Sequence, residues 1–439
     1  MVVRPFASFH PEAVPAISRA NYARELKYTL LFSTTLAIVE GGVIGVLVKN
    51  AFADIVSAGR LAAIVALLGA LPEGANISSF LWAGIAHGRE KVKLITRLQL
   101  IVLVSILAVA AMPRTELGLY LTAGAVVAAR LCIAGIVTLR AALWRANYSR
   151  FERAKSTGKF STISVIVIAL TGFLLGRLMD QRVETYRVFV PLVCLLGLLG
   201  SRSYRGIRMR GRAAAIKAEK LTDRAATFHP MAMISLLRQD RYYARFMGSM
   251  FVIGFGNLML TAPLVITLKD RFGQGYLGGI AVTTAIPYLV MPWFIPMWAR
   301  LLAKKHVVHF RTIHSWVFVL AQAIVLAAVV TKTYWLLFGS SFAMGVAMAG
   351  GTLAWNLGHL DFAPGPKAAQ YMGVHVTLNG VRGIVAPFLA VGLYRLLEHW
   401  QVGAGSWVFA VSVVLCALGA IGFAALGRAM GERAHRPRE

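Results

Sequence analysis

The chain has 439 residues, of which 58% are hydrophobic and only 15% are charged, and its mean hydropathy is +0.67. Soluble globular proteins carry about 25% charged residues, so composition excludes a water-soluble fold. The formal net charge of +28 would suit a nucleic-acid partner, but the basic residues lie in the gaps between apolar runs and not along one face, so we expect no nucleic acid to bind.

Apolar runs of about 20 residues, the length that crosses a hydrocarbon core of about 30 Å, recur along the chain. The predicted spans are 28–48, 61–86, 95–112, 117–139, 160–179, 187–200, 246–268, 277–299, 312–330, 334–355, 372–394 and 405–427. Lipid offers backbone groups no partner, so the spans must be helices or a closed barrel, and the sequence lacks the alternating strands of a barrel. We therefore predict an all-α membrane protein of twelve transmembrane helices.

One long polar connection divides the spans into two groups of six. The predicted domains are a cytoplasmic N-terminal segment (1–27), an N-terminal six-helix bundle (28–200), a basic cytoplasmic linker (201–245), a C-terminal six-helix bundle (246–427) and a cytoplasmic tail (428–439). Within the linker, residues 213–226 form either a basic helix on the membrane surface or a solvated stretch, and composition does not decide between them.

The distribution of Lys and Arg predicts the orientation of the chain. With both termini cytoplasmic, and with basic residues at span ends counted with the adjoining loop, 34 of the 46 basic residues fall in the inner segments and 10 in the outer loops, while Arg130 and Arg382 lie well within spans. Such an excess of basic residues on one side is typical of the cytoplasmic side of a membrane protein. We therefore expect both termini to be cytoplasmic and the inner loops to face anionic lipid.

No residue pattern indicates an enzyme, a cofactor or a metal site. The sequence contains no nucleophile elbow, phosphate-binding loop or zinc motif, and its three cysteines lie singly inside apolar runs. His359, Asp361 and His375 could be imagined as metal ligands, but their spacing matches no compact site, so we expect Asp361 to serve in gating or in helix capping.

The two halves of the chain carry a weak internal repeat. Trp82-Ala83 at the end of the second span and Trp298-Ala299 at the end of the eighth are 216 residues apart. A second match, Ala154-x-x-x-Gly158 with Ala369-x-x-x-Gly373, has an offset of 215. Repeats of this kind are common in transporter folds.

With six helices, a basic loop and six more helices, the sequence resembles the major facilitator superfamily over nearly its whole length. That resemblance implies two pseudo-symmetric six-helix bundles and a gating loop after the second helix, here Gly84, Gly88, Arg89 and Lys91. The acidic residue of the family's motif is missing from this loop. The family's arginine in the fourth helix has a counterpart in Arg130, but no proline marks span 160–179 as in typical drug antiporters.

Four charged residues fall well inside spans: Glu40, Glu73, Arg130 and Arg382. Placing an ionised group there costs about 2.5–3.5 kcal/mol on insertion scales, so such residues usually have partners or a function. Depths counted at 1.5 Å per residue place Glu40 near the level of Arg130, and Glu73 near that of Arg382. We predict two pairs, Glu73–Arg382 linking the halves and Glu40–Arg130 at the cavity wall, with Glu40 as the protonation site; static bridges are the alternative.

Uncharged polar residues complete the candidate coupling or substrate site. They are Asn76, Asn257, Asn356 and Asn379. Asn76 follows Glu73 by three residues and Asn379 precedes Arg382 by three, so each shares a helix face with its charged neighbour.

Two functions remain open. The first is a secondary transporter of a small organic solute, coupled to H⁺, working by alternating access as a monomer in a bacterial cytoplasmic (inner) membrane. The second is a transport-inactive assembly factor or scaffold that keeps the same fold. Neither the identity of the solute nor the direction of transport follows from the residues.

Overall fold

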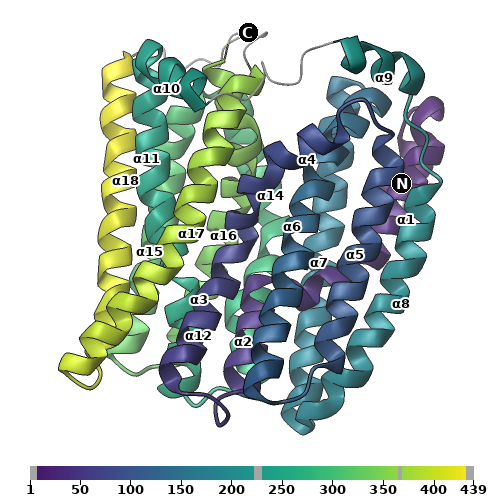
Figure 1. Cartoon of the computed structure of the whole chain (residues 1–439). Coiled ribbons are helices and arrows are strands. Elements are labelled where there is room, and N and C mark those ends of the chain that lie inside the picture. Colours follow the sequence, from purple (N-terminus) through teal and green to yellow (C-terminus); the bar gives the residue numbers. More distant parts are fainter. Residues whose placement is uncertain (1–6, 222–229, 364–367, 432–439) are drawn as a thin grey trace. The chain divides into compact units, whose positions relative to one another are not determined.

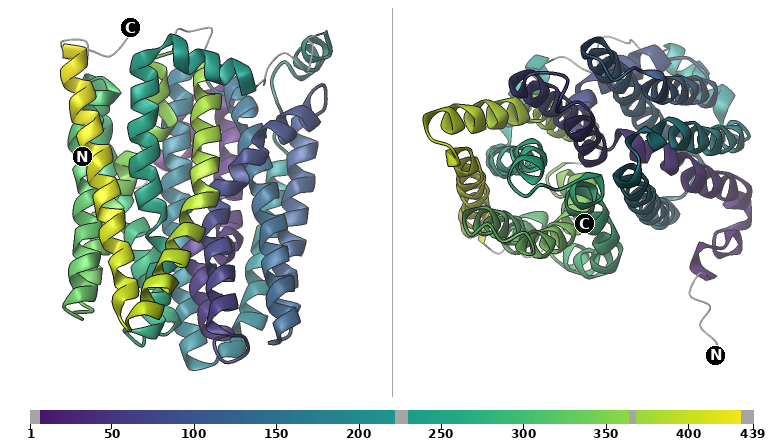
Figure 2. Two further views of the ribbon diagram at one scale, coloured as in Figure 1. Left: turned by 60° about the vertical axis from the view of Figure 1, so that its left-hand side comes forward. Right: turned by 90° about the horizontal axis from the view of Figure 1, so that it is seen from below.

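The computed structural model describes residues 7–221, 230–363 and 368–431. These residues form helices and connecting loops, with no strand among them. The chain divides into two compact units. Unit 1 comprises Met1–Glu40, Ser78–Pro113 and Leu117–Thr227, and unit 2 comprises Gly41–Ile77, Arg114–Glu116 and Phe228–Glu439. Within each unit the long helices run lengthwise beside one another (Figures 1 and 2).

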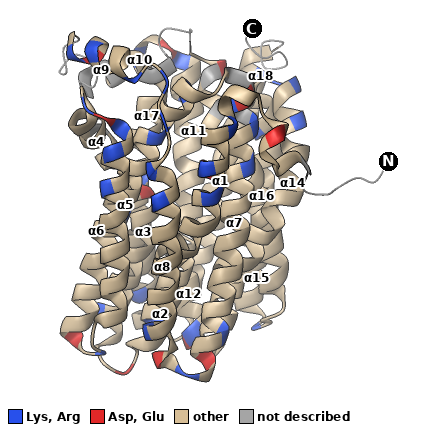
Figure 3. Cartoon of the chain, turned by 90° about the vertical axis from the view of Figure 1, so that its right-hand side faces the viewer, with Lys and Arg blue, Asp and Glu red and all other residues tan. Residues whose placement is uncertain are grey.

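The predicted spans are confirmed as helices. In the described residues eleven helices are long and apolar enough to cross a membrane, and a twelfth span results if Ala16–Val39 and Gly42–Ala51, which meet at a 42° bend, are taken together. Lys, Arg, Asp and Glu gather toward the helix ends, and the middle stretches are nearly free of them (Figure 3). The protein is therefore an integral multi-pass membrane protein.

Unit 1 is built around the packed pair of helices α1 and α8. Its helices are α1 (Ala16–Leu36), α4 (Ser79–Ala86), α5 (Lys91–Ala111), α6 (Glu116–Asn147), α7 (Arg150–Gln181), α8 (Tyr186–Arg205) and α9 (Arg212–Leu221). α8 packs closely on α1 because Gly200 faces the backbone nitrogen of Phe32, where an added Cβ would come within 3.1 Å. The Thr35 hydroxyl also donates to the Val193 carbonyl at 2.7 Å, a polar contact typical of membrane helix interfaces.

The opposite face of α8 is apolar and exposed. Val188, Leu192, Leu195 and Leu199 are each about half exposed or more, at spacings that place them on one side of the helix. A soluble protein would bury such a stripe, whereas a membrane helix turns it toward lipid.

Unit 2 contains the remaining helices. They are α2 (Gly41–Ala51), α3 (Ala58–Gly74), α10 (Pro230–Gln239), α11 (Arg241–Leu258), α12 (Thr261–Asp270), α13 (Tyr276–Ile280), α14 (Ile286–Lys304), α15 (Val307–Val330), α16 (Leu336–Leu357), α17 (Ala368–Trp400) and α18 (Val408–Met430). α11 packs on α18 through Gly419, and α3 packs on α17 through Gly383. Small residues at these positions let the helix backbones approach.

Several spans are broken where the sequence predicted continuous helices. The first span is interrupted at Glu40, whose backbone is extended (ψ 135°) after the 3₁₀ turn Ala37–Val39. The second changes to a 3₁₀ turn at Ala75–Ser78, soon after Pro72, and the seventh breaks between α11 and α12. Glu40 therefore lies at a helix break and not in the middle of a helix, whereas Glu73 lies in the last turn of α3, directly before the change to the 3₁₀ turn.

Differences also appear at the ends of the predicted segments. α1 begins at Ala16, well before the apolar run at residue 28. In the linker, α9 covers the first part of the stretch 213–226, which is helical to Leu221, while residues 222–229 lie outside the described residues. Residues 432–439 of the predicted tail also lie outside them. The three cysteines are buried and free.

Candidate functional site

The predicted pair of Glu40 and Arg130 forms within unit 1. Arg130, in the middle of α6, places Nη2 3.2 Å from Glu40 Oε2. Its Nε also donates to the Val39 carbonyl at 2.9 Å, and Nη2 donates to the same oxygen. This carbonyl is available because the helix breaks there, so the break supplies one partner and the carboxylate another. The Glu40 side chain is 20% exposed.

In unit 2 the predicted direct bridge between Glu73 and Arg382 is absent from the described contacts. Asn379 stands between the two charges instead. Its Nδ2 donates to Glu73 Oε2, and its Oδ1 accepts from Arg382 Nε at 3.1 Å. The amide thus hydrogen-bonds both ions without bringing them into contact. Asn76 adds a second, longer donor to Glu73 Oε2 at 3.3 Å.

Arg382 is held by neutral oxygen atoms. It is 8% exposed, and its Nη1 donates to the Met250 carbonyl of α11. The guanidinium lies over Gly254, where an added Cβ would collide with Nη1. In the described residues Arg382 makes no ion pair within 4.0 Å, so this buried cation is partnered entirely by an amide and a carbonyl. A carboxylate approaching it would gain a strong charge-assisted bond.

The other predicted asparagines have different surroundings. Asn257 accepts from Gln322 Nε2 at 3.2 Å, and Gln322 contacts Ser412, which links α11, α15 and α18 beside the break in the seventh span. Asn356 is exposed and donates to the Thr352 carbonyl of its own helix at 2.8 Å. Asn257 therefore belongs to a buried polar network of unit 2, whereas Asn356 stands apart from the charged residues.

Asp361 caps a helix. Its Oδ2 accepts from the backbone N–H of Val307, the first residue of α15, at 2.7 Å. Burial raises the pKa of this carboxyl, although the hydrogen bond from Val307 acts to lower it. In the described residues no three His, Cys, Asp or Glu side chains are placed to hold a metal ion together.

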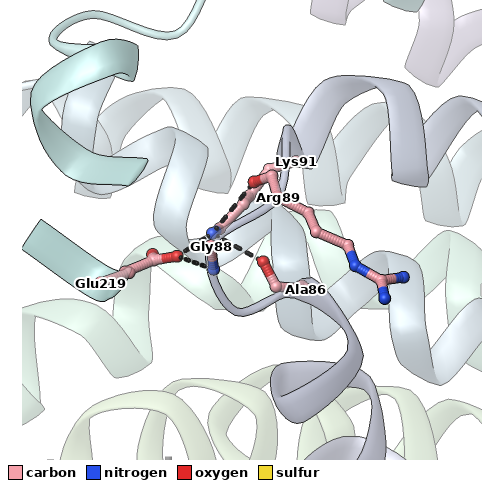
Figure 4. Close-up of polar contacts among 5 residues, drawn as sticks. All are labelled: Ala86, Gly88, Arg89, Lys91 and Glu219. Carbon is pink, nitrogen blue, oxygen red and sulfur yellow. Dashed lines mark hydrogen bonds and ion pairs between the residues drawn. The ribbon is translucent and has the colours of Figure 1, made fainter. Parts of the chain in front are cut away.

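The predicted gating loop is joined to the linker helix α9 by a carboxylate that the sequence analysis missed. Glu219 Oε2 accepts from the backbone N–H of Gly88 at 2.8 Å and from Lys91 Nζ (Figure 4). Lys91 is 7% exposed and also donates to the carbonyls of Ala86 and Arg89, at 2.9 and 3.3 Å. We call this set of contacts the α9 clasp.

Backbone geometry and a second ion pair support the α9 clasp. Gly88 has φ +67°, a conformation that glycine adopts readily. Arg212 Nη1 lies 2.9 Å from Glu90 Oε1, which ties the start of α9 to the same loop. Burial acts to raise the pKa of Glu219, but the hydrogen bonds from Lys91 and Gly88 outweigh it and lower the pKa.

The remaining loop residues take no side-chain part in the clasp. The Gly84 carbonyl accepts from the His87 N–H at 3.3 Å, which closes the end of α4. The Arg89 side chain points away from Glu219 in Figure 4.

A second missed residue is Glu25 of α1. It is 2% exposed and accepts from Trp144 Nε1 and, at 3.1 Å, from the Tyr148 hydroxyl. Its position before the apolar run at residue 28 concealed it, and the only signal available in the sequence was an acidic residue flanked by aromatic ones.

No protein-family model matches the sequence, and no curated protein matches it significantly. The fold, however, is that of solved transporters. A D-xylose–proton symporter superposes with a TM-score of 0.69 at 14% identity, over 91% of this chain and 96% of the other. The nucleoside transporter NupG gives 0.68 at 13% identity, over 93% and 99%. A bacterial homolog of the human lysosomal transporter Spinster, inward-facing and unoccupied, gives 0.67 at 15% identity, over 97% and 99%.

Proposed function

We propose that this chain, which has the fold of the major facilitator transporters, is a secondary transporter that moves a small organic solute by alternating access and couples it to H⁺ through Glu40. The observation that carries the proposal is the Glu40–Arg130 pair at a helix break. Broken helices whose free backbone groups meet ions are typical of transporter sites. The solved structures with this fold include one named as a proton symporter.

The chemistry of coupling needs only a carboxyl whose arginine neighbour changes with conformation. A nearby guanidinium favours the ionised carboxylate, and its removal favours the protonated form. A carboxyl that gains and loses Arg130 would therefore release and take up a proton once per cycle. Glu73 is the second candidate, because Asn379 already holds it close to Arg382.

The α9 clasp is proposed as part of the gate. It anchors the linker to the loop between α4 and α5, so movement of the linker would strain or break the contact between Lys91 and Glu219. This assignment assumes that the loop, the linker and both termini are cytoplasmic, as the charge distribution predicts, in a bacterial inner membrane.

The test is solute-driven proton flux in liposomes that hold the purified protein and an internal pH indicator. D-xylose, uridine and a dipeptide are the solute classes to try first. We expect one of them to acidify or alkalinise the lumen, and Glu40→Gln to abolish that response. Glu184→Gln, which alters an exposed ion pair with Arg187, is the matched control and leaves the response intact.

Two outcomes would contradict the proposal. An unchanged pH dependence of solute flux in both Glu40→Gln and Glu73→Gln would exclude coupling through these carboxyls. If no solute produces flux and the protein copurifies stoichiometrically with a membrane complex, the scaffold function is the better account.

A further inference from the structure

A cavity of about 990 Å³ opens at one end of unit 2, and none of the residues of the Glu73–Asn379–Arg382 contacts or of the polar network around Asn257 lines it. It lies where α12, α15 and α17 end, beside the start of α3, and the loop after α17 closes one side. Its volume is at the upper end of the range for small-molecule sites. Part of its wall is apolar: Ala58, Ala62, Ile266, Val330 and Trp407.

The charged residues of the wall give it an excess of positive charge. The cations are Lys49, Arg271, Lys332 and Arg395, and the anions are Asp270 and Glu398. Both carboxylates are already engaged. Asp270 lies 2.9 Å from Lys49 Nζ. Glu398 accepts from the backbone N–H groups of Gly403 and Gly405, at 2.8 and 2.9 Å, and lies 3.5 Å from Arg271.

Two cations of the wall are left without a carboxylate partner in the described residues, namely Lys332 and Arg395. The guanidinium of Arg395 lies against Gly59 of α3, where an added Cβ would fall 2.5 Å from Nη2. An anionic group that enters the cavity can therefore pair with both of these cations.

The rim of the cavity indicates what kind of ligand reaches it. Val402 is 92% exposed, Trp407 58%, and the neighbouring Trp400 75%. Exposed tryptophans at helix ends are typical of the boundary between lipid and water. A ligand at this height meets hydrocarbon on one side and water on the other.

We propose that this cavity binds an amphipathic anion, with its phosphate or other anionic head on Arg395 and Lys332 and its apolar tail along Ala62, Ile266 and Val330. The site is separate from the transport chemistry proposed above. The same headgroup chemistry is offered by an anionic phospholipid of the surrounding leaflet and by a free amphiphile.

The first measurement is calorimetric titration of the delipidated, detergent-purified full chain with decyl phosphate, decanol and inorganic phosphate. We expect decyl phosphate to bind, and decanol and inorganic phosphate to bind at least tenfold more weakly, because each supplies only half of the interaction. Arg395→Gln should weaken decyl phosphate binding at least tenfold. Arg428→Gln removes an exposed cation from the last turn of α18, outside the cavity, and should leave binding unchanged.

The second measurement distinguishes the source of the anion. The protein is reconstituted in nanodiscs of phosphatidylcholine with phosphatidylglycerol, and the lipids retained on release are counted by native mass spectrometry. Retention of phosphatidylglycerol that Arg395→Gln abolishes supports the site with lipid as its source, and decyl phosphate binding alone supports it with a free amphiphile. The proposal is overturned if the wild-type chain binds neither decyl phosphate nor phosphatidylglycerol. It is also overturned if the Arg395→Gln variant, whose thermal unfolding transition shows that it is folded, binds both ligands as the wild type does.

Discussion

Glu219 of α9 accepts a hydrogen bond from the backbone N–H of Gly88 at 2.8 Å, across more than a hundred residues of sequence. The loop that contains Gly88 lacks the acidic residue of the motif it resembles, and the linker helix supplies a carboxylate to the same loop. Lys91 of the loop is nearly buried and finds its counter-ion there. The electrostatic part of the loop is therefore completed by a residue outside the motif.

Glu219→Gln should loosen α9. The substitution keeps an acceptor for Gly88 but removes the charge opposite Lys91, and hydrogen bonds to charged groups contribute about 1.5–3 kcal/mol. We expect amide hydrogen exchange in α9 to quicken by roughly tenfold or more, since about 1.4 kcal/mol corresponds to a factor of ten. Glu184→Gln, at an exposed pair, should leave exchange in α9 unchanged. Equal amide exchange of α9 in the wild type, Glu219→Gln and Glu184→Gln would show that the α9 clasp does not hold this helix in place.

The α9 clasp should also respond to acid in a defined direction. The pKa of Glu219 is lowered in the folded protein. A carboxyl of this kind contributes stability above its unfolded pKa, and that stability is lost as the pH falls through the folded value. We therefore expect exchange in α9, corrected for its intrinsic pH dependence, to be constant from pH 7 to pH 5 and to rise only below about 4.3, the ordinary pKa of glutamate. Glu219→Gln should reduce this step to the part that the Glu90–Arg212 pair contributes; a step near pH 6 would contradict the assignment.

Asn379→Ala should destabilise unit 2 strongly. The amide is the donor to Glu73 and an acceptor for Arg382, so its loss leaves two charged groups short of partners in a buried region. An unsatisfied buried group costs about 1–3 kcal/mol and more when charged, so we expect about 3 kcal/mol, measured by thermal or denaturant unfolding in detergent. Asn356→Ala removes only an exposed bond within one helix and should cost less than about 0.5 kcal/mol. Similar losses for both would show that the Asn379 bridge contributes little.

Gly383→Ala tests the close approach of α3 and α17. A Cβ at this position would lie 2.6 Å from the Glu73 Cβ and 2.9 Å from the Gly74 nitrogen. The helices must separate to admit it, and overpacking of this kind costs about 1–3 kcal/mol. Gly392, in the same helix, has nothing within 4 Å of the position that an added methyl group would take, so Gly392→Ala should be neutral or stabilise by up to about 1 kcal/mol. Unfolding measurements should therefore show a loss of stability for Gly383→Ala and none for Gly392→Ala; equal losses would show that the close approach at Gly383 is not what limits packing there.

The helical spans could be predicted from the sequence because lipid imposes one requirement on every crossing segment. The Glu40–Arg130 pair followed from counting depth along two helices, and the structure contains that pair. The same counting placed Glu73 and Arg382 at one level, but a depth known to a few ångströms does not decide whether two side chains touch or an amide lies between them.

Other features had little local signal in the sequence. The break at Glu40 depends on an extended backbone conformation that apolar composition does not encode. Glu219 reaches Gly88 through tertiary packing of α9, and nothing in the spacing of either segment indicates the contact. Glu25 was hidden because α1 extends beyond the apolar run from which its start was inferred.

The carbonyl oxygen of Val39 lowers the free-energy cost of protonating Glu40. Arg130 donates hydrogen bonds to that carbonyl through two nitrogens, and it also donates to the Glu40 carboxylate. It therefore keeps a hydrogen-bond acceptor when Glu40 becomes neutral. Leaving a buried cation with no acceptor would carry a penalty of several kcal/mol. Because the Val39 carbonyl remains an acceptor for Arg130, the Glu40 carboxyl can turn away from the arginine and become protonated without leaving that cation unpaired.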